Sequence, residues 1–171
     1  MSPTIEILII LLLTLGNSLF VMSEMAIVSA RKVRLQQMAN QGDTKARAAL
    51  DLASEPNQFL PTVQIGITLI IIVSGAFGEG TIVKYLAPIL AGIPLLQEYK
   101  EAIASAIAIL FITYLTLVIG ELVPKRLALN NPERISASVA KPLQMFAKFA
   151  SPVVYVLSAS TDMVVRLLGI Q

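Results

Sequence analysis

The sequence predicts an all-α membrane protein with three transmembrane helices and further amphipathic helices beside the membrane. Hydrophobic residues make up 56% of the 171 residues and charged residues only 14%. In typical soluble domains, about 45–50% of the residues are apolar and about 25% are charged. Three stretches also approach the roughly 20 apolar residues that a helix needs to cross a bilayer. This balance argues against a soluble enzyme domain and against a disordered chain.

Three residue types are absent, which restricts the catalytic and metal-binding chemistry open to this chain. The sequence contains no Cys, no His and no Trp. Disulfides, thiol nucleophiles, imidazole bases and metal sites built on Cys or His are therefore excluded. Because the other residues show no nucleophile–base pairing, we expect no enzyme. The net charge of +2 is too small to indicate a polyanionic partner, and the aromatic residues are too few for base stacking, so we expect no nucleic-acid partner. Any bound metal ion must be held by oxygen atoms.

The three expected spans cover about residues 5–30, 59–77 and 102–123. Basic residues indicate their orientation, because cytoplasmic loops of membrane proteins carry an excess of Lys and Arg. They cluster after the first and third spans: Arg31, Lys32, Arg34, Lys45, Arg47, Lys125, Arg126, Arg134, Lys141 and Lys148. We therefore expect a multi-pass protein of the cell (inner or plasma) membrane, with its N-terminus outside and its C-terminus in the cytoplasm.

The segment between the second and third spans is interrupted. Residues 81–96 carry one lysine and two prolines, which predicts a broken, surface-lying or re-entrant segment. Just before this segment, three glycines surround Glu79. They predict a helix break at the far membrane interface, with Glu79 in solvent.

Two cytoplasmic segments are expected to be helical. Residues 32–55 have apolar stripes interrupted at Asn40-Gln41-Gly42, which indicates a helical hairpin with Asp43 near the start of its second helix. Residues 133–171 are apolar but punctuated by charges and prolines. They favour amphipathic helices on the cytoplasmic surface, with a fourth span as the alternative.

Two carboxylates fall inside the spans, Glu24 and Glu121. A carboxylate in the hydrocarbon region costs about 2.5–3.5 kcal/mol on insertion scales, so it normally faces protein or water and has a role. For Glu24, a structural pair and a functional role both remain open. Around Glu121, Gly120 allows close backbone approach, Pro124 frees a carbonyl near Gly120, and Lys125 offers a counter-charge. Freed carbonyls beside a carboxylate suit a hard cation.

Further polar residues lie on the first two spans. Asn17 lies seven residues before Glu24, and Ser23 shares their stripe. Gln64 and Thr68 share one face of the second span. Each residue alone is explained by a hydrogen bond between helices. Together, the polar stripes of three helices indicate a hydrated path or an ion site between them.

Three motifs in this order resemble the DUF21 transmembrane domain of the CNNM/CorC family of magnesium transporters. They are Asn17 with residues 23–32, residues 62–69, and Gly120-Glu121-Leu122-Val123-Pro124-Lys125. The third motif is the most specific, and Val-Gln-Ile-Gly-Ile-Thr in the second is typical of the bacterial hemolysin-like branch. The resemblance covers essentially the whole chain.

This resemblance implies a homodimer in the lipid bilayer, with three spans per subunit and a juxtamembrane helical belt. It also implies a local widening of the third helix near Glu121. Residues 1–171 would form a single DUF21 domain. Family members usually continue into cytoplasmic CBS domains that bind ATP and then a small C-terminal domain. We expect the chain to be a truncated part of such a protein, so that ATP would act only through domains that this chain lacks.

The resemblance further implies a secondary-type transporter that binds a dehydrated Mg²⁺ between helices and moves it by alternating access, coupled to a Na⁺ gradient. Metal contacts are expected from Glu121, Ser23, Gly66 and Gly120. An ion path or structural support is expected from Asn17, Glu24, Gln64, Thr68, Pro124 and Lys125. Magnesium-transporting relatives often carry Ser and Asn where this chain has Val21 and Ile67.

Two alternatives remain at this point. The chain could be a non-transporting membrane scaffold or sensor whose dimer serves the CBS domains, with its buried carboxylates in structural pairs. It could also transport another divalent ion or an organic cation.

Overall fold

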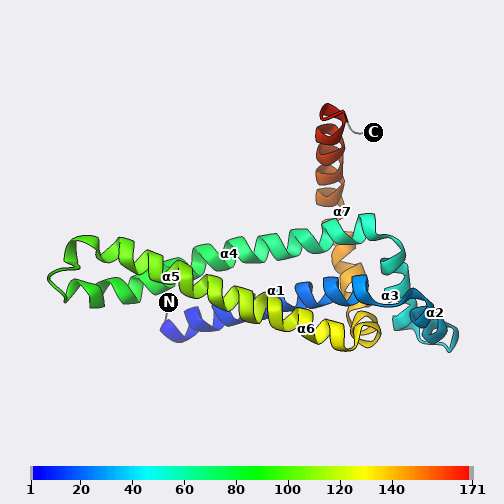
Figure 1. The fold of residues 1–171 in the computed structure, drawn as a ribbon, viewed down its shortest axis with the longest axis horizontal. Helices are drawn as coiled ribbons and strands as arrows, with labels where there is room; N and C mark the ends of the chain where they lie inside the picture. Colours follow the sequence, from blue (N-terminus) through cyan, green and yellow to red (C-terminus); the bar gives the residue numbers. More distant parts are fainter. Residues whose placement is uncertain (1, 170–171) are drawn as a thin grey trace. The chain divides into compact units, whose positions relative to one another are not determined.

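The computed structural model describes residues 2–169, which fold into helices joined by short turns and contain no strand (Figure 1). The helices in order are α1 (Pro3–Ser29), α2 (Lys32–Asn40), α3 (Thr44–Ser54), α4 (Pro56–Ala91), the 3₁₀-helix η1 (Gln97–Tyr99), α5 (Lys100–Leu117), the π-helix η2 (Val118–Leu122), α6 (Val123–Asn130) and α7 (Pro132–Leu167). The described chain forms two compact units. The first comprises residues 2–22 and 66–127, and the second comprises residues 23–65 and 128–169.

Three helical segments are long and apolar enough to cross a membrane, namely Pro3–Ser29, Pro56–Ala91 and Gln97–Asn130. Among the described residues α7 is not one of them, which favours three spans over the alternative of four. The predicted all-α class with three membrane-spanning helices is thus confirmed.

The expected interruption of residues 81–96 is wrong for residues 81–91, and the helix is broken only at the turn of residues 92–96. Helix α4 continues through the three glycines and through Pro88 as far as Ala91, 14 residues beyond the expected end at residue 77. In lipid, a backbone N–H or C=O group without a hydrogen-bond partner costs several kcal/mol of free energy. A helix within the membrane therefore continues through glycine and proline residues that would end it in water. Glu79 is half-buried and accepts a hydrogen bond from the Ser105 hydroxyl, instead of lying free in solvent.

In the first unit, α4 and α5 run antiparallel and are joined by the turn at η1 (Figure 1). Close helix contacts occur where one partner is a glycine. A Cβ at Gly78 would lie 2.8 Å from Ile112 Cδ1, and one at Gly66 would lie 2.7 Å from the Phe20 ring. An ion pair also joins α1 to α4, with 2.9 Å between the Lys84 Nζ and the buried Glu6 Oε1.

In the second unit, the predicted hairpin is confirmed. Helices α2 and α3 meet at a turn in which Gly42 has a φ of 94°, a left-handed conformation that favours glycine. Asp43 caps α3, since its carboxylate accepts from the backbone N–H groups of Lys45 and Ala46. The core of this unit joins the hairpin to α7 and consists of Ala30, Leu35, Ala46, Ala48, Ala49, Ala137 and Ala140.

The C-terminal segment forms one helix rather than several. Helix α7 runs from Pro132 to Leu167 with Pro142 and Pro152 inside it. Its buried residues lie between Glu133 and Ala150, and residues 151–169 are almost entirely exposed. The prediction for residues 133–171 was therefore correct about helix but wrong about separate helices, and residues 170–171 lie outside the described part.

An ion pair ties the chain after α1 to the first turn of α7. The Arg31 Nε lies 3.1 Å from Glu133 Oε1, and the Arg31 backbone N–H donates to the same oxygen. Burial alone raises the pKa of the Glu133 carboxyl. The hydrogen bonds from the Arg31 side chain and from nearby backbone N–H groups outweigh it, so the pKa lies below its ordinary value.

We expect Leu35→Ala to destabilise the second unit strongly. Leu35 is fully buried in an alanine-rich core, so truncation leaves a cavity that costs about 2–5 kcal/mol. Chemical unfolding of the purified chain in detergent measures this loss. Val33→Ala is the matched control, because Val33 is 74% exposed; equal losses in both variants would contradict the proposed core.

We expect stability to fall in acid because of Glu133. Its pKa is lower in the folded chain than in the unfolded chain, so its contribution is complete at neutral pH and is lost below about pH 5 as the carboxyl takes up a proton. Thermal unfolding between about pH 7 and pH 3 should show a smaller acid loss in Glu133→Gln than in the wild type. Identical pH profiles would show that this pair is not responsible.

Candidate functional site

The π-helix η2 interrupts the third span beside Pro124. It covers Val118–Leu122, and the Val123 N–H donates to the Val118 carbonyl five residues earlier. A proline has no N–H, so Pro124 leaves the carbonyls four and five residues before it, those of Gly120 and Ile119, without their donor. The widening of the third helix that the resemblance implied is therefore present.

Two polar side chains of α1 fill the vacant positions. The Asn17 amide donates to the Gly120 carbonyl at 3.1 Å, and the Ser18 hydroxyl lies 2.7 Å from the Ile119 carbonyl. Asn17 is buried, and its Oδ1 has no hydrogen-bond partner among the described residues. A Cβ at Gly120 would lie only 2.9 Å from the Asn17 Nδ2, so the absence of a side chain there lets α1 approach.

Glu121 and Lys125 form an ion pair one helical turn apart. The Lys125 Nζ lies 2.6 Å from the Glu121 Oε1, and both side chains are 39% exposed. Within the first unit the structure thus brings together Asn17 with Gly120 and Glu121 with Lys125, from the predicted set. The carboxylate, the neighbouring carbonyls and the unpaired Asn17 oxygen give this region oxygen atoms of the type that hard cations bind.

The other predicted residues of the first unit lie on α4. Gly66 is buried against Phe20, while Thr68 is exposed. Val21 on α1 and Ile67 on α4 are both buried apolar residues. They supply no side-chain oxygen at the two positions where relatives often carry Ser and Asn.

Three predicted residues belong to the second unit. Ser23 is buried, Glu24 is half-buried and Gln64 is exposed. Ser23 and Glu24 lie on α1, and Gln64 lies on α4. Within this unit no ion pair of Glu24 is found among the described residues.

Ser18 is the site residue that the sequence did not reveal. The sequence did contain an indication of this role. Pro124 leaves two carbonyls without a donor, and the hydroxyl of the residue directly after Asn17 can reach the second of them. Its hydroxyl also lies 2.9 Å from the Thr14 carbonyl, which is the ordinary partner of a serine within a helix.

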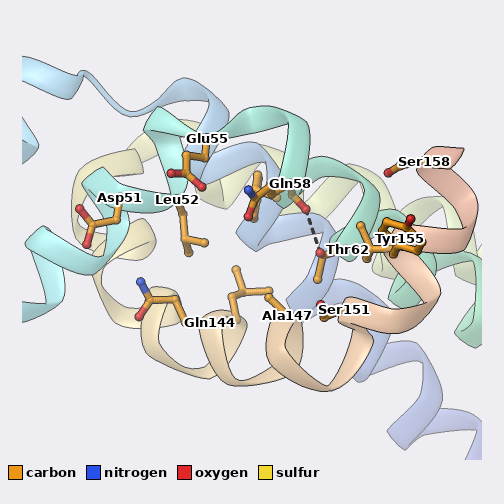
Figure 2. Close-up of a pocket in the computed structure, with 13 residues that line it drawn as sticks. Asp51, Leu52, Glu55, Gln58, Thr62, Gln144, Ala147, Ser151, Tyr155 and Ser158 are labelled. Carbon is orange, nitrogen blue, oxygen red and sulfur yellow. Dashed lines mark hydrogen bonds between the residues drawn. The ribbon is translucent and has the colours of Figure 1, made fainter. Parts of the chain in front are cut away.

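The second unit also holds an open groove that the sequence did not predict (Figure 2). Its volume is about 460 Å³, and it lies between α3, the start of α4 and the middle of α7. Figure 2 shows Asp51 and Glu55 on one wall and Gln144 and Ser151 on the other. The described residues contain no group of three acidic residues placed to hold a metal ion.

Comparison with known proteins identifies the family. Residues 7–171 match the family described as the cyclin M (CNNM) transmembrane N-terminal domain. The chain belongs to the CNNM transmembrane family. The predicted membership is thereby confirmed, and the three apolar helices are those of a multi-pass membrane protein.

Named relatives of this CNNM domain are bacterial. It is 51% identical to the UPF0053 protein sll0260 of Synechocystis over 99% of this chain and 38% of that protein. It is 33% identical to the UPF0053 protein YugS of Bacillus subtilis over 90% of this chain and 36% of that protein. A Haemophilus influenzae relative, 30% identical over 96% of this chain and 38% of that protein, is named polyamine export protein. The chain thus spans less than two fifths of the length of these relatives.

We expect Gly120→Ala to destabilise the first unit, because the new Cβ would lie 2.9 Å from the Asn17 amide and force it away from the carbonyl. Measured hydrogen bonds between membrane helices contribute about 0.6 kcal/mol on average, with a maximum near 1.7. Gly75→Ala is the matched control, since nothing beyond its own helix backbone lies within 4 Å of a Cβ there, and the gain in helix propensity of about 1 kcal/mol applies to both variants. The unfolding midpoint should therefore be lower for Gly120→Ala than for Gly75→Ala; equal midpoints or the reverse order would contradict the contact.

Proposed function

We propose that this CNNM domain is the membrane part of a secondary transporter that binds Mg²⁺ between its helices. The observation that carries the proposal is the third span beside Glu121. There the Glu121 carboxylate directly follows Gly120, whose carbonyl accepts from the Asn17 amide, and the buried Asn17 Oδ1 has no hydrogen-bond partner among the described residues. Mg²⁺ prefers oxygen ligands in octahedral geometry and gives up its water reluctantly.

In this proposal, each of the predicted site residues has a role. Glu121 supplies the charge, and Ser23 and the backbone at Gly66 and Gly120 supply neutral oxygens. Lys125 balances Glu121 when no cation is bound. Asn17, Glu24, Gln64, Thr68 and Pro124 line the ion path or support the helices. Because Val21 and Ile67 contribute no oxygen, backbone carbonyls and retained water would complete the shell.

The wider setting is also proposed. The domain works as a homodimer, as the family resemblance implies. Its N-terminus lies outside and its C-terminus in the cytoplasm, because basic residues follow the first and third spans. Transport proceeds by alternating access, driven by a Na⁺ gradient. The named relatives are more than twice as long as this chain, which leaves room for CBS domains that bind ATP. We propose no enzymatic reaction, since the sequence shows no nucleophile–base pairing and few ionisable groups.

One observation favours a second candidate cargo. The Haemophilus influenzae relative is named polyamine export protein, and a polyamine is an organic cation that Glu121 could also attract. The missing side-chain oxygens at Val21 and Ile67 fit a larger, less demanding cation better than they fit Mg²⁺. A non-transporting scaffold would instead need neither cation to bind.

We expect Glu121→Gln to weaken Mg²⁺ binding at least about tenfold, because the proposed ligands lose their one carboxylate in a medium of low dielectric constant. Isothermal titration of the purified chain in detergent measures the Kd, with spermidine titrated in parallel. Lys125→Gln should act in the opposite direction, since it removes the ammonium group that occupies the Glu121 Oε1.

Glu98→Gln is the matched control, because Glu98 is an exposed residue of η1 and the substitution removes the same charge. Circular dichroism confirms that each variant keeps its helix content. Unchanged Mg²⁺ binding in Glu121→Gln would refute the site, and spermidine bound in preference to Mg²⁺ would support the second cargo. If the wild type binds neither cation, the scaffold interpretation holds.

A further inference from the structure

A second pocket of the second unit lies beside the start of α7. Its volume is about 620 Å³, within the range of about 300–1,000 Å³ that is usual for ligand pockets. Its walls come from α2, from the turn before α3, from residues 129–131 and from the first turns of α7. All of them belong to one compact unit.

The pocket carries an excess of unpaired positive charge. Four basic side chains line it, namely Arg31, Arg34, Lys45 and Arg134, against the two carboxylates of Asp43 and Glu133. Both carboxylates are already engaged. Asp43 accepts the two backbone N–H groups that start α3, and Glu133 pairs with Arg31. In the described chain, the other three basic side chains form no ion pair, and their residues are exposed.

Neutral hydrogen-bond donors complete the pocket. Asn130 and Asn131 lie on its wall, and Asn131 precedes α7 without making a side-chain cap. Helix α7 begins at Pro132, which has no N–H, and the Glu133 N–H is engaged by its own carboxylate. The start of this 36-residue helix therefore adds the Arg134 N–H and the positive end of the helix dipole. Amide donors, N–H groups and guanidinium groups around one cavity form a set that suits anionic oxygens.

We propose that this pocket binds a phosphate-bearing anion. Arg34, Lys45 and Arg134 supply the charge, and the start of α7 supplies neutral donors. The same chemistry is offered by the headgroup of an anionic phospholipid and by a free phosphate group. The pocket follows directly on Ser29, where the first membrane-spanning helix ends, and basic pockets at that level of membrane proteins bind lipid headgroups. The proposal does not depend on which cation, if any, the domain transports.

The test uses the whole chain purified in detergent and three probes: dihexanoyl phosphatidylglycerol, inorganic pyrophosphate and dihexanoylglycerol, which lacks phosphate. The double variant Arg34→Gln/Arg134→Gln should weaken binding of the phosphate probes at least about tenfold, as expected for the loss of two charge-assisted contacts. Arg47→Gln/Lys148→Gln removes the same charge from exposed residues outside the pocket, and it should change the Kd by less than about twofold.

A second measurement needs no variant. The bound probe should slow chemical acetylation of Lys45 in the wild type and leave Lys148 unaffected, as read by mass spectrometry. Binding of the lipid probe alone assigns the site to a phospholipid headgroup, and binding of pyrophosphate assigns it to phosphate itself. Equal weakening by both double variants, binding of dihexanoylglycerol as tight as that of the lipid, or unchanged acetylation of Lys45 would overturn the proposal.

Discussion

The contact between α1 and the third span depends on one constraint, the need to pair every backbone carbonyl within a membrane. Pro124 withholds a donor from the carbonyls of Gly120 and Ile119, and the side chains of Asn17 and Ser18 supply the replacements. Because these donors are short, α1 must lie close to η2, and this closeness explains why residue 120 has no side chain. The same arrangement gathers polar oxygens beside Glu121, so the feature that repairs the backbone also creates the candidate site.

That constraint also explains where the sequence was misleading. Glycines and prolines end helices in water because the released backbone groups find new partners there, and the interruption expected after residue 77 rests on this behaviour. Helix α4 instead continues to Ala91, since a break within an apolar layer would leave those groups unpaired. Gly78 lets Ile112 approach, and Lys84 reaches a partner on α1. In α4, Gly66 and Gly78 thus serve to pack the helix against its neighbours instead of ending it.

What could be predicted from the sequence was local. The spans, the α2–α3 turn, the Asp43 cap and the carbonyl near Gly120 each follow from residues a few positions apart. The partners of Glu6 and Glu79 are 78 and 26 residues away, and they depend on how one helix is placed along another. Hydrophobic patterning fixes which segments enter the membrane but not this register. Ser18 was overlooked for a related reason, because its bond within α1 masks its reach toward Ile119.

The pair of Glu121 and Lys125 bears on how a membrane can hold an acidic site without a cation. A lone carboxylate in the hydrocarbon region costs about 2.5–3.5 kcal/mol, whereas the ion pair carries no net charge. Because the two residues are one turn apart on the same helix, the pair forms without help from any other element. A cation that binds Glu121 must displace the ammonium group, and the long lysine side chain can then extend toward the polar interface. In the transporter we propose, binding thus exchanges one counter-ion for another, and the carboxylate is never left alone in lipid.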